Sequence, residues 1–239
     1  MIEVYICQLP EEKNRVVLGK LLPHVSAERQ DRIKRFIHIN DAYRTLLGEL
    51  LLRFILVRRY GSISKQLDFA KNLYGKPFLG QYPLFHYNIA HSGEWVVCAV
   101  HNQEIGVDVE RILPFDLGIA KQFFTGEEYW NLLNAKEERA AVFYDLWTLK
   151  ESYLKAQGRG LSIPLDSFSV KIHSSDSIEL TDMKTRKTMT DYSCKQYRLN
   201  KQYRLSVCAN HANLSDFEKL PMLVSFNNLC ADFNSPLSG

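Results

Sequence analysis

Two acidic residues alternate with two valines in the segment Gly106-Val107-Asp108-Val109-Glu110. Successive side chains of a β-strand point to opposite faces, so this spacing predicts Asp108 and Glu110 on one face and the valines on the other. Neighbouring carboxylates repel one another unless a cation or a basic group lies between them. Oxygen ligands of this kind suit magnesium. An exposed strand face explains the same alternation without any binding site.

A second segment, Trp147 to Lys155, carries Glu151 and Lys155 four residues apart. This spacing places both side chains on one face of a helix. In an arbitrary helix it indicates a solvent-exposed salt bridge. If Glu151 folds back beside Asp108 and Glu110, however, the three carboxylates form a cation site, with a lysine one turn away that can hold phosphate.

Basic side chains stand at two predicted turns and along one predicted helix. His91 precedes a Ser-Gly turn, whose backbone N–H groups can bind an anion. Lys76 precedes Pro77, which favours an extended backbone at the lysine. The segment 29–59 is also rich in arginine and lysine, which predicts a phosphate-binding surface. Ordinary surface turns are the alternative interpretation of His91 and Lys76.

The composition is that of a globular protein, with 46% hydrophobic and 24% charged residues among 239. A net charge of +3 is too small to predict nucleic-acid binding. We find no apolar run long enough to cross a membrane and no secretory signal at the start, so we expect a cytoplasmic protein. The five cysteines are scattered, which predicts neither a disulfide framework nor a zinc site.

The hydrophobic pattern predicts clustered strands and clustered helices rather than regular βα alternation, which favours the α+β class. The expected elements are a strand at 2–7, a helical segment at 26–60 ended by Gly61, strands within 67–111, a helical segment at 117–157 ended by Gly158 and Gly160, and strands within 166–210. We expect an N-terminal subdomain at 1–104, a C-terminal subdomain at 105–211 and a tail at 212–239. The polar end of the tail predicts loosely held last residues.

These motifs, in this order, resemble the Sfp-type phosphopantetheinyl transferases over most of the chain, from Ser26 to His211. The matching text includes DAYRTLLGELLLR, YGKPFL, FHYNIAHSGEWV, IGVDVER, FFTGEEY and LWTLKESYLKAQGRGLS. The motifs GVDVE and WTLKESYLK are highly specific as a pair. The resemblance implies two similar α+β subdomains packed as an intramolecular pseudo-dimer, with coenzyme A bound at their junction. It also implies a monomer.

The resemblance assigns roles to individual residues. Asp108, Glu110 and Glu151 are the implied ligands of magnesium, for which manganese can substitute. Glu151, Lys155 and His91 are the implied catalytic residues, and either Glu151 or a water on the metal takes the proton. The implied contacts to coenzyme A are Arg29, Arg32, Arg44, Thr45, Lys76, Ala90, His91 and Lys155. At Ala90 this chain departs from the family, because a serine is usual there and its hydroxyl is lost.

The implied reaction transfers the 4′-phosphopantetheine arm of coenzyme A to a serine of an apo carrier-protein domain and releases adenosine 3′,5′-bisphosphate. The implied partners are acyl or peptidyl carriers of nonribosomal peptide or polyketide synthases, docking on the segment 111–129. That segment offers Leu113, Phe115, Leu117, Phe123 and Phe124, each of which core packing explains equally well. Two other functions stay open: a metal-dependent phosphohydrolase, and a carrier-binding module without catalysis.

Overall fold

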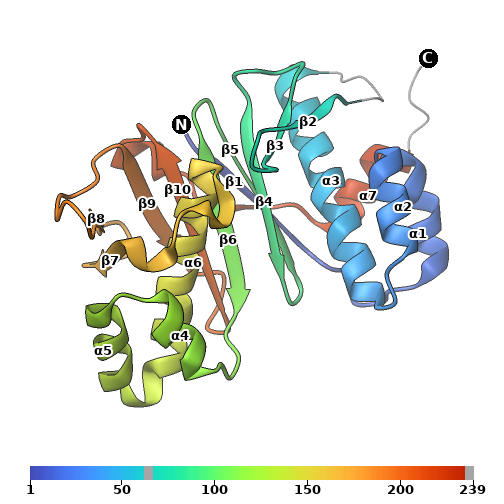
Figure 1. Ribbon diagram of the computed structural model, residues 1–239. Helices are drawn as coiled ribbons and strands as arrows, with labels where there is room; N and C mark the ends of the chain where they lie inside the picture. The colour runs from blue at the N-terminus through green and yellow to red at the C-terminus, as the bar shows by residue number, and fades with distance from the viewer. Residues whose placement is uncertain (62–66, 235–239) are drawn as a thin grey trace.

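The computed structural model describes residues 1–61 and 67–234. Two sheets lie next to each other in the middle of the molecule (Figure 1). The first has the strand order β11-β1-β5-β4, with bounds Met222–Leu223, Glu3–Gln8, Trp95–His101 and His86–Ser92. The second has the order β6-β10-β9, with bounds Ile105–Arg111, Tyr203–Asn210 and Tyr192–Tyr197. Two short hairpins pair β2 (Phe69–Lys71) with β3 (Pro77–Leu79), and β7 (Phe168–Ile172) with β8 (Ile178–Asp182).

Each sheet is covered on its outer side by one long helix, α3 (Ile39–Tyr60) for the first sheet and α6 (Arg139–Gln157) for the second (Figure 1). The shorter helices are α1 (Arg15–Leu21), α2 (Ala27–Lys34), α4 (Leu117–Phe123), α5 (Gly126–Asn134) and α7 (Phe226–Asn234). Five 3₁₀ turns connect these elements: Leu22–His24, Lys136–Glu138, Gly160–Ser162, Leu165–Ser167 and Leu214–Phe217. The expected α+β fold with two similar subdomains is therefore confirmed.

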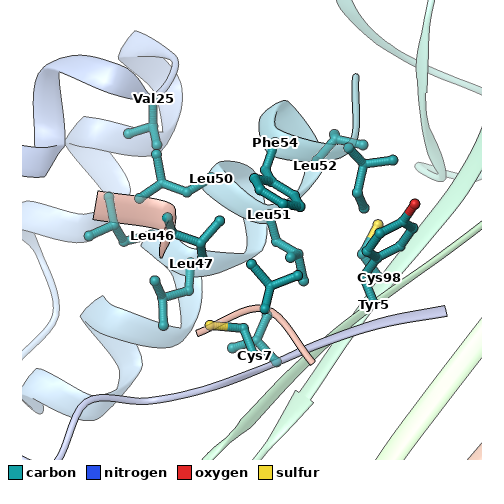
Figure 2. Close-up of a cluster of buried hydrophobic side chains, with 14 of the residues drawn as sticks. Tyr5, Cys7, Val25, Leu46, Leu47, Leu50, Leu51, Leu52, Phe54 and Cys98 are labelled. Carbon is teal, nitrogen blue, oxygen red and sulfur yellow. The ribbon is translucent and has the colours of Figure 1, made fainter. Parts of the chain in front are cut away.

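Successive side chains of a strand point to opposite faces of its sheet, and this alternation divides the core into three layers. In β1, Tyr5 and Cys7 pack towards α3, where they join a cluster of leucines from that helix (Figure 2). Val4 and Ile6 point the other way and meet Val107 and Val109 of β6 in a core shared by the two sheets. A third cluster lies under α6. The shared core fixes the two subdomains against each other.

The helical segments expected at 26–60 and 117–157 are each interrupted, so an uninterrupted helix is wrong for both. The first consists of α2 and α3, because the chain turns at Arg35 to His38 and lets the two helices pack together. The second consists of α4, α5 and α6. Thr125 and Glu128 form a capping box that starts α5 as a separate helix. Both expected stops are confirmed: the long helices end at Gly61 and Gly158, which have φ values of 79° and 65°.

The tail returns to the first subdomain. β11 pairs in parallel with β1, and α7 packs against α3, where Leu229 is fully buried. The prediction of loosely held last residues concerns 235–239, which lie outside the described residues.

Candidate active site

The acidic face of β6 lies under α6. Val107 and Val109 are fully buried in the shared core, so Asp108 and Glu110 occupy the opposite face, as their spacing predicts. Gly106 lies on that same face. A Cβ atom there would overlap the carbonyl oxygen of Ser152 and the backbone nitrogen of Ala156. The glycine therefore allows the last turns of α6 to lie directly on β6.

This close approach brings Lys155 to Asp108. The ammonium nitrogen of Lys155 lies 2.6 Å from Oδ1 of Asp108, and Asp108 is 4% exposed. Oδ2 of Asp108 is buried and has no hydrogen-bond partner among the described residues. Desolvation opposes the charge on Lys155, but the combined effect of Asp108, Glu151 and Glu110 outweighs it and raises the pKa of the ammonium.

Burial also affects the two glutamates. Burial raises the pKa of Glu110, and the charge of Asp108 adds to this, whereas a hydrogen bond from the Ser92 hydroxyl to Oε2 at 2.6 Å opposes it. Burial likewise raises the pKa of Glu151, with Lys155 opposing and Asp108 adding to the effect. The three carboxylates thus lie close enough to act on one another electrostatically.

The donor set suits a hard cation, although it is not closed around one position. In residues 1–61 and 67–234, no three acidic, histidine or cysteine side chains converge on a common metal position. Two observations nevertheless fit a cation. A buried carboxylate oxygen of Asp108 lacks a partner, and repulsion among the carboxylates would be relieved by positive charge. Oxygen ligands are those that magnesium prefers.

A cavity of about 230 Å³, which we call the basic cavity, opens between α2, α3 and β4. Five of the predicted contacts to coenzyme A line it: Arg29, Arg32, Arg44, Thr45 and His91. Apolar parts of its wall come from Leu52, Phe69, Pro77, Tyr87 and Ile89. The cavity therefore combines cations with flat apolar surface.

The cations of the basic cavity are held by their neighbours. Arg44 donates to the carbonyl oxygen of Gly93 and to the carboxylate of Asp41, both at 2.6 Å. The hydrogen bond from Arg44 lowers the pKa of Asp41. Desolvation and then the charges of Arg44, Lys155 and Arg32 lower the pKa of His91. Because the side chain of His91 is exposed, we attribute the lowered pKa more to the charges of the three cations than to desolvation.

Alternation along β4 separates two roles. Tyr87, Ile89 and His91 face the basic cavity. Asn88 and Ser92 contact the second subdomain: the side-chain oxygen of Asn88 accepts a hydrogen bond from the backbone of Val107 at 2.9 Å, and the Ser92 hydroxyl donates to Glu110. Asn88 also reaches the wall of the basic cavity. The side chain of Ala90 is 6% exposed and belongs to the shared core, so it does not line the basic cavity.

A second cavity of about 280 Å³, which we call the apolar cavity, lies at the junction of the subdomains. Its wall contains Tyr74, Gly75, Lys76, Pro77, Asn88, Glu151, Leu154, Lys155, Gly158 and Gly160. Pro77 and Asn88 line both cavities, so the two adjoin. The Lys76 ammonium donates to the carbonyl oxygens of Ile105 at 3.1 Å and Ala156 at 3.0 Å. Lys76 thus connects the subdomains beside Lys155.

Sequence reasoning missed several residues of this site. Asn88 and Ser92 were not singled out, although their spacing from His91 places them on the face of β4 opposite to it. Glu49, which lines the basic cavity at 1% exposure, was taken only as part of a helical pattern. The local signals are the leucines on both sides of Glu49 and Arg53 four residues later, which together indicate a buried ion pair on α3.

Cations around one cavity and carboxylates beside the adjoining one define an enzyme site for a phosphate-bearing substrate. The family model of the 4′-phosphopantetheinyl transferase superfamily matches residues 104–208, and that of the N-terminal part of 4′-phosphopantetheinyl transferases matches residues 12–103. The chain belongs to this family and is a 4′-phosphopantetheinyl transferase of the Sfp type.

Three relatives illustrate the range of similarity. The 4′-phosphopantetheinyl transferase Sfp of Bacillus subtilis is 40% identical, over 92% of this chain and 95% of the relative. The 4′-phosphopantetheinyl transferase gsp of Aneurinibacillus migulanus is 38% identical, over 90% and 89%. The human L-aminoadipate-semialdehyde dehydrogenase-phosphopantetheinyl transferase is 29% identical, over 59% and 50%.

None of the helices in the described ranges has the length and apolar character of a membrane span.

Proposed function

We propose that this enzyme transfers the 4′-phosphopantetheine arm of coenzyme A to a serine of an apo acyl or peptidyl carrier domain and releases adenosine 3′,5′-bisphosphate. One observation carries the proposal: the basic cavity and the apolar cavity adjoin at Pro77 and Asn88, with Glu151 and Lys155 in the wall of the second. A substrate with a phosphorylated nucleotide at one end and an uncharged arm at the other fits such a pair.

The nucleotide of coenzyme A occupies the basic cavity in this proposal. Tyr87, Ile89 and Phe69 offer apolar surface to the base. Phosphate groups pair with the cations, which are Arg29, Arg32, Arg44 and His91. Thr45, which is 5% exposed, adds a hydroxyl to the same wall. At Ala90 only the backbone remains available to the nucleotide, because the side chain packs in the shared core.

The pantetheine arm extends into the apolar cavity. Leu154, Tyr74 and the two glycines Gly158 and Gly160 give this cavity a mostly apolar wall. Lys76 contributes its aliphatic stem there, since its ammonium already donates to two backbone carbonyls. The bridging phosphates then lie between the cavities, next to Lys155.

Magnesium, or manganese in its place, is held by Asp108, Glu110 and Glu151. When bound, the cation neutralises negative charge on the pyrophosphate and on the leaving group. The unpartnered oxygen of Asp108 and the raised pKa values of the two glutamates support this assignment. The hydroxyl of Ser92 donates to Glu110 and is not one of the proposed metal ligands.

The carrier serine oxygen attacks the phosphorus that bears the pantetheine arm. A new P–O bond forms to the serine, and the P–O bond to adenosine 3′,5′-bisphosphate breaks. Glu151 takes the hydroxyl proton, and burial makes it a stronger base than an ordinary glutamate because it raises the pKa. Lys155 and His91 place positive charge near the oxygens that become more negative.

Carrier docking is proposed on the segment that follows β6. Leu113 is 49% exposed, Ile119 39% and Trp130 of α5 65%, which gives this side of the second subdomain free apolar surface. Phe124 is 4% exposed and its ring packs in a tilted arrangement against Phe143, so core packing explains it. We propose carriers of nonribosomal peptide or polyketide synthases as the partners.

A monomer in the cytoplasm completes the proposal. Every cation and carboxylate of the site comes from one chain, so no second copy is needed. All five cysteines are free thiols, which suits a reducing compartment.

The test incubates the protein with coenzyme A, magnesium and an apo carrier domain, and follows the carrier by mass spectrometry. We expect one phosphopantetheine arm on the carrier serine and an equal amount of adenosine 3′,5′-bisphosphate. Hydrolysis of coenzyme A without modification of the carrier, or binding of the carrier alone, would contradict the proposal. Full turnover in the presence of a metal chelator would contradict its magnesium site.

A further inference from the structure

An acidic residue lies in the wall of the otherwise basic cavity. Glu49 of α3 is 1% exposed. Its oxygen Oε1 accepts hydrogen bonds from Nε and Nη2 of Arg53 at 3.0 and 2.8 Å, and from the backbone N–H of Ser26 at 2.7 Å. Its oxygen Oε2 accepts from the Ser26 hydroxyl at 2.8 Å and lies 3.6 Å from Nε of Arg29.

A carboxylate at this depth is costly unless its charge is matched and its lone pairs are used. Arg53 and the two groups of Ser26 supply most of that compensation. Arg29 contributes only through Nε, and its side chain is 32% exposed. Because the guanidinium is planar and rigid, fixing Nε sets the direction of the two terminal nitrogens. Arg29 lines the basic cavity, so its contact with Glu49 orients the two terminal nitrogens before a ligand enters.

Glu49 also determines where α2 begins. Ser26 occupies the N-cap position of α2, yet its side chain makes no capping hydrogen bond to the helix. Both the hydroxyl and the backbone N–H of Ser26 are directed to Glu49 instead. The start of α2 is therefore tied to the middle of α3. Since α2 carries Arg29 and Arg32 into the basic cavity, one buried carboxylate on α3 sets the placement of both.

We propose that Glu49 is a positioning residue for coenzyme A: without touching the reacting atoms, it orients Arg29 and anchors α2 so that the basic cavity is preformed for phosphate. The inference rests on the proposed function, in which Arg29 contacts coenzyme A. It assigns Glu49 an effect on affinity for coenzyme A and none on the chemical step.

The experiment is a double-mutant cycle in which calorimetry measures the affinity for coenzyme A. Glu49→Gln keeps the size of the side chain and removes its charge. We expect it to weaken binding about tenfold, with kcat at saturating coenzyme A changed less than about twofold. Because Glu49 also places Arg32 through α2, Glu49→Gln should weaken binding less in the Arg29→Ala background than in the unaltered protein, and hardly at all when Arg29 and Arg32 are both replaced by alanine. Additive losses would overturn the proposal, because they indicate independent effects.

Glu3→Gln is the matched control for loss of stability. Glu3 likewise pairs with two cations, Lys219 at 2.9 Å and Arg59 at 3.6 Å, but it does not line the basic cavity. It should lower the melting temperature without changing affinity. If Glu49→Gln does not fold, the cycle uses Glu49→Asp, which keeps the charge and withdraws it by one methylene. A smaller loss of affinity that is again reduced in the Arg29→Ala background is then expected.

The proposed contact of Arg29 with coenzyme A and the positioning role of Glu49 can be contradicted separately. If Arg29→Ala alone leaves the affinity for coenzyme A unchanged, the proposed contact of Arg29 is wrong, and the positioning role of Glu49 is overturned with it. If Arg29→Ala weakens binding and Glu49→Gln or Glu49→Asp does not, the function stands and the positioning role is overturned.

Discussion

The ammonium of Lys155 lies 2.6 Å from Oδ1 of Asp108, while Oδ2 of the same carboxylate is buried without a partner among the described residues. This contact joins the last turns of α6 to β6 and places a positive charge next to the acidic face. Asp108 therefore has two functions in the proposed site. One oxygen holds Lys155, and the other is available to a cation.

Asp108→Asn tests both functions at once. The variant keeps the shape of the side chain but loses the charge that pairs with Lys155 and binds a cation. We expect the rate of arm transfer to fall by at least about 100-fold, equivalent to about 2.7 kcal/mol of transition-state stabilisation. Mass spectrometry of the carrier at saturating coenzyme A measures it. A loss below about threefold would contradict the role of Asp108.

The acidic face of β6 was predictable because it depends only on local periodicity. Asp108 and Glu110 alternate with valines, and the alternation of side chains along any β-strand places the two carboxylates on one face. The helical character of α6 and its stop at Gly158 followed from local signals as well. The break within 26–60 did not, because the packing of α2 against α3 decides it. The break before α5 has a local signal, the capping box of Thr125 and Glu128, which hydrophobic periodicity alone does not detect.

Long-range contacts were not predictable from the sequence. The sequence implies a contact of Lys76 with coenzyme A but gives no sign of the hydrogen bonds that its ammonium donates to the carbonyls of Ile105 and Ala156, which are distant in the chain. The carboxylate of Glu49 meets Arg53 one turn along the same helix, but its contacts with Ser26 and Arg29 exist only because the folded chain packs α2 against α3. In both cases the distant partners are backbone groups or side chains with no sequence signature.

Gly106→Ala should separate Lys155 from Asp108. The added methyl group would overlap the backbone of α6 at Ser152 and Ala156, which cannot move as a flexible side chain would. We expect a lower melting temperature and a loss of transfer larger than the loss of coenzyme A affinity, because α6 carries Glu151 and Lys155. Differential scanning calorimetry and transfer kinetics measure the two effects.

Gly19→Ala is the matched control for that substitution. Gly19 lies within α1, and a Cβ atom there meets nothing within 4 Å. Replacing an exposed helical glycine by alanine should stabilise the protein by up to about 1 kcal/mol and leave transfer unchanged. Equal behaviour of the two variants would contradict the close-packing argument for Gly106.

Binding of coenzyme A should depend on pH through His91. In the free enzyme, desolvation and nearby cations hold the pKa of His91 below 6.5, so the imidazole is neutral near pH 7. A bound phosphate favours the imidazolium form and raises the pKa. Binding then takes up a proton between the two pKa values, and affinity rises as the pH falls through that window, by at most tenfold per pH unit.

Calorimetry between about pH 8 and 6, a range that covers the usual titration of histidine, measures how the affinity for coenzyme A changes with pH. His91→Asn should weaken binding and flatten the slope. His173→Asn is the control, since His173 is an exposed residue of the β7–β8 hairpin paired with Glu179. A slope that persists in His91→Asn would assign the proton uptake to another group.

The stability of the second subdomain should depend on a buried ion pair beside the site. Lys150 precedes Glu151 on α6 and is 0% exposed. Its ammonium lies 2.9 Å from Glu128 and donates to the carbonyl oxygens of Leu165 and Phe168 at 2.8 and 2.7 Å. Lys150→Met leaves the carboxylate of Glu128 buried without its cation. We expect the free energy of unfolding in denaturant to fall by about 3 to 5 kcal/mol.

The double variant Lys150→Met with Glu128→Gln separates charge from packing. It removes both buried charges, and the amide can still accept the hydrogen bond from the backbone of Val170 that Glu128 accepts at 2.7 Å. We expect it to regain a large part of the lost stability. Lys71→Met is the control, because Lys71 and Glu28 form an exposed pair whose loss should cost less than about 1 kcal/mol. If the double variant is less stable than Lys150→Met by the full cost of Glu128→Gln alone, the two residues act independently and the ion pair does not hold α5 against α6.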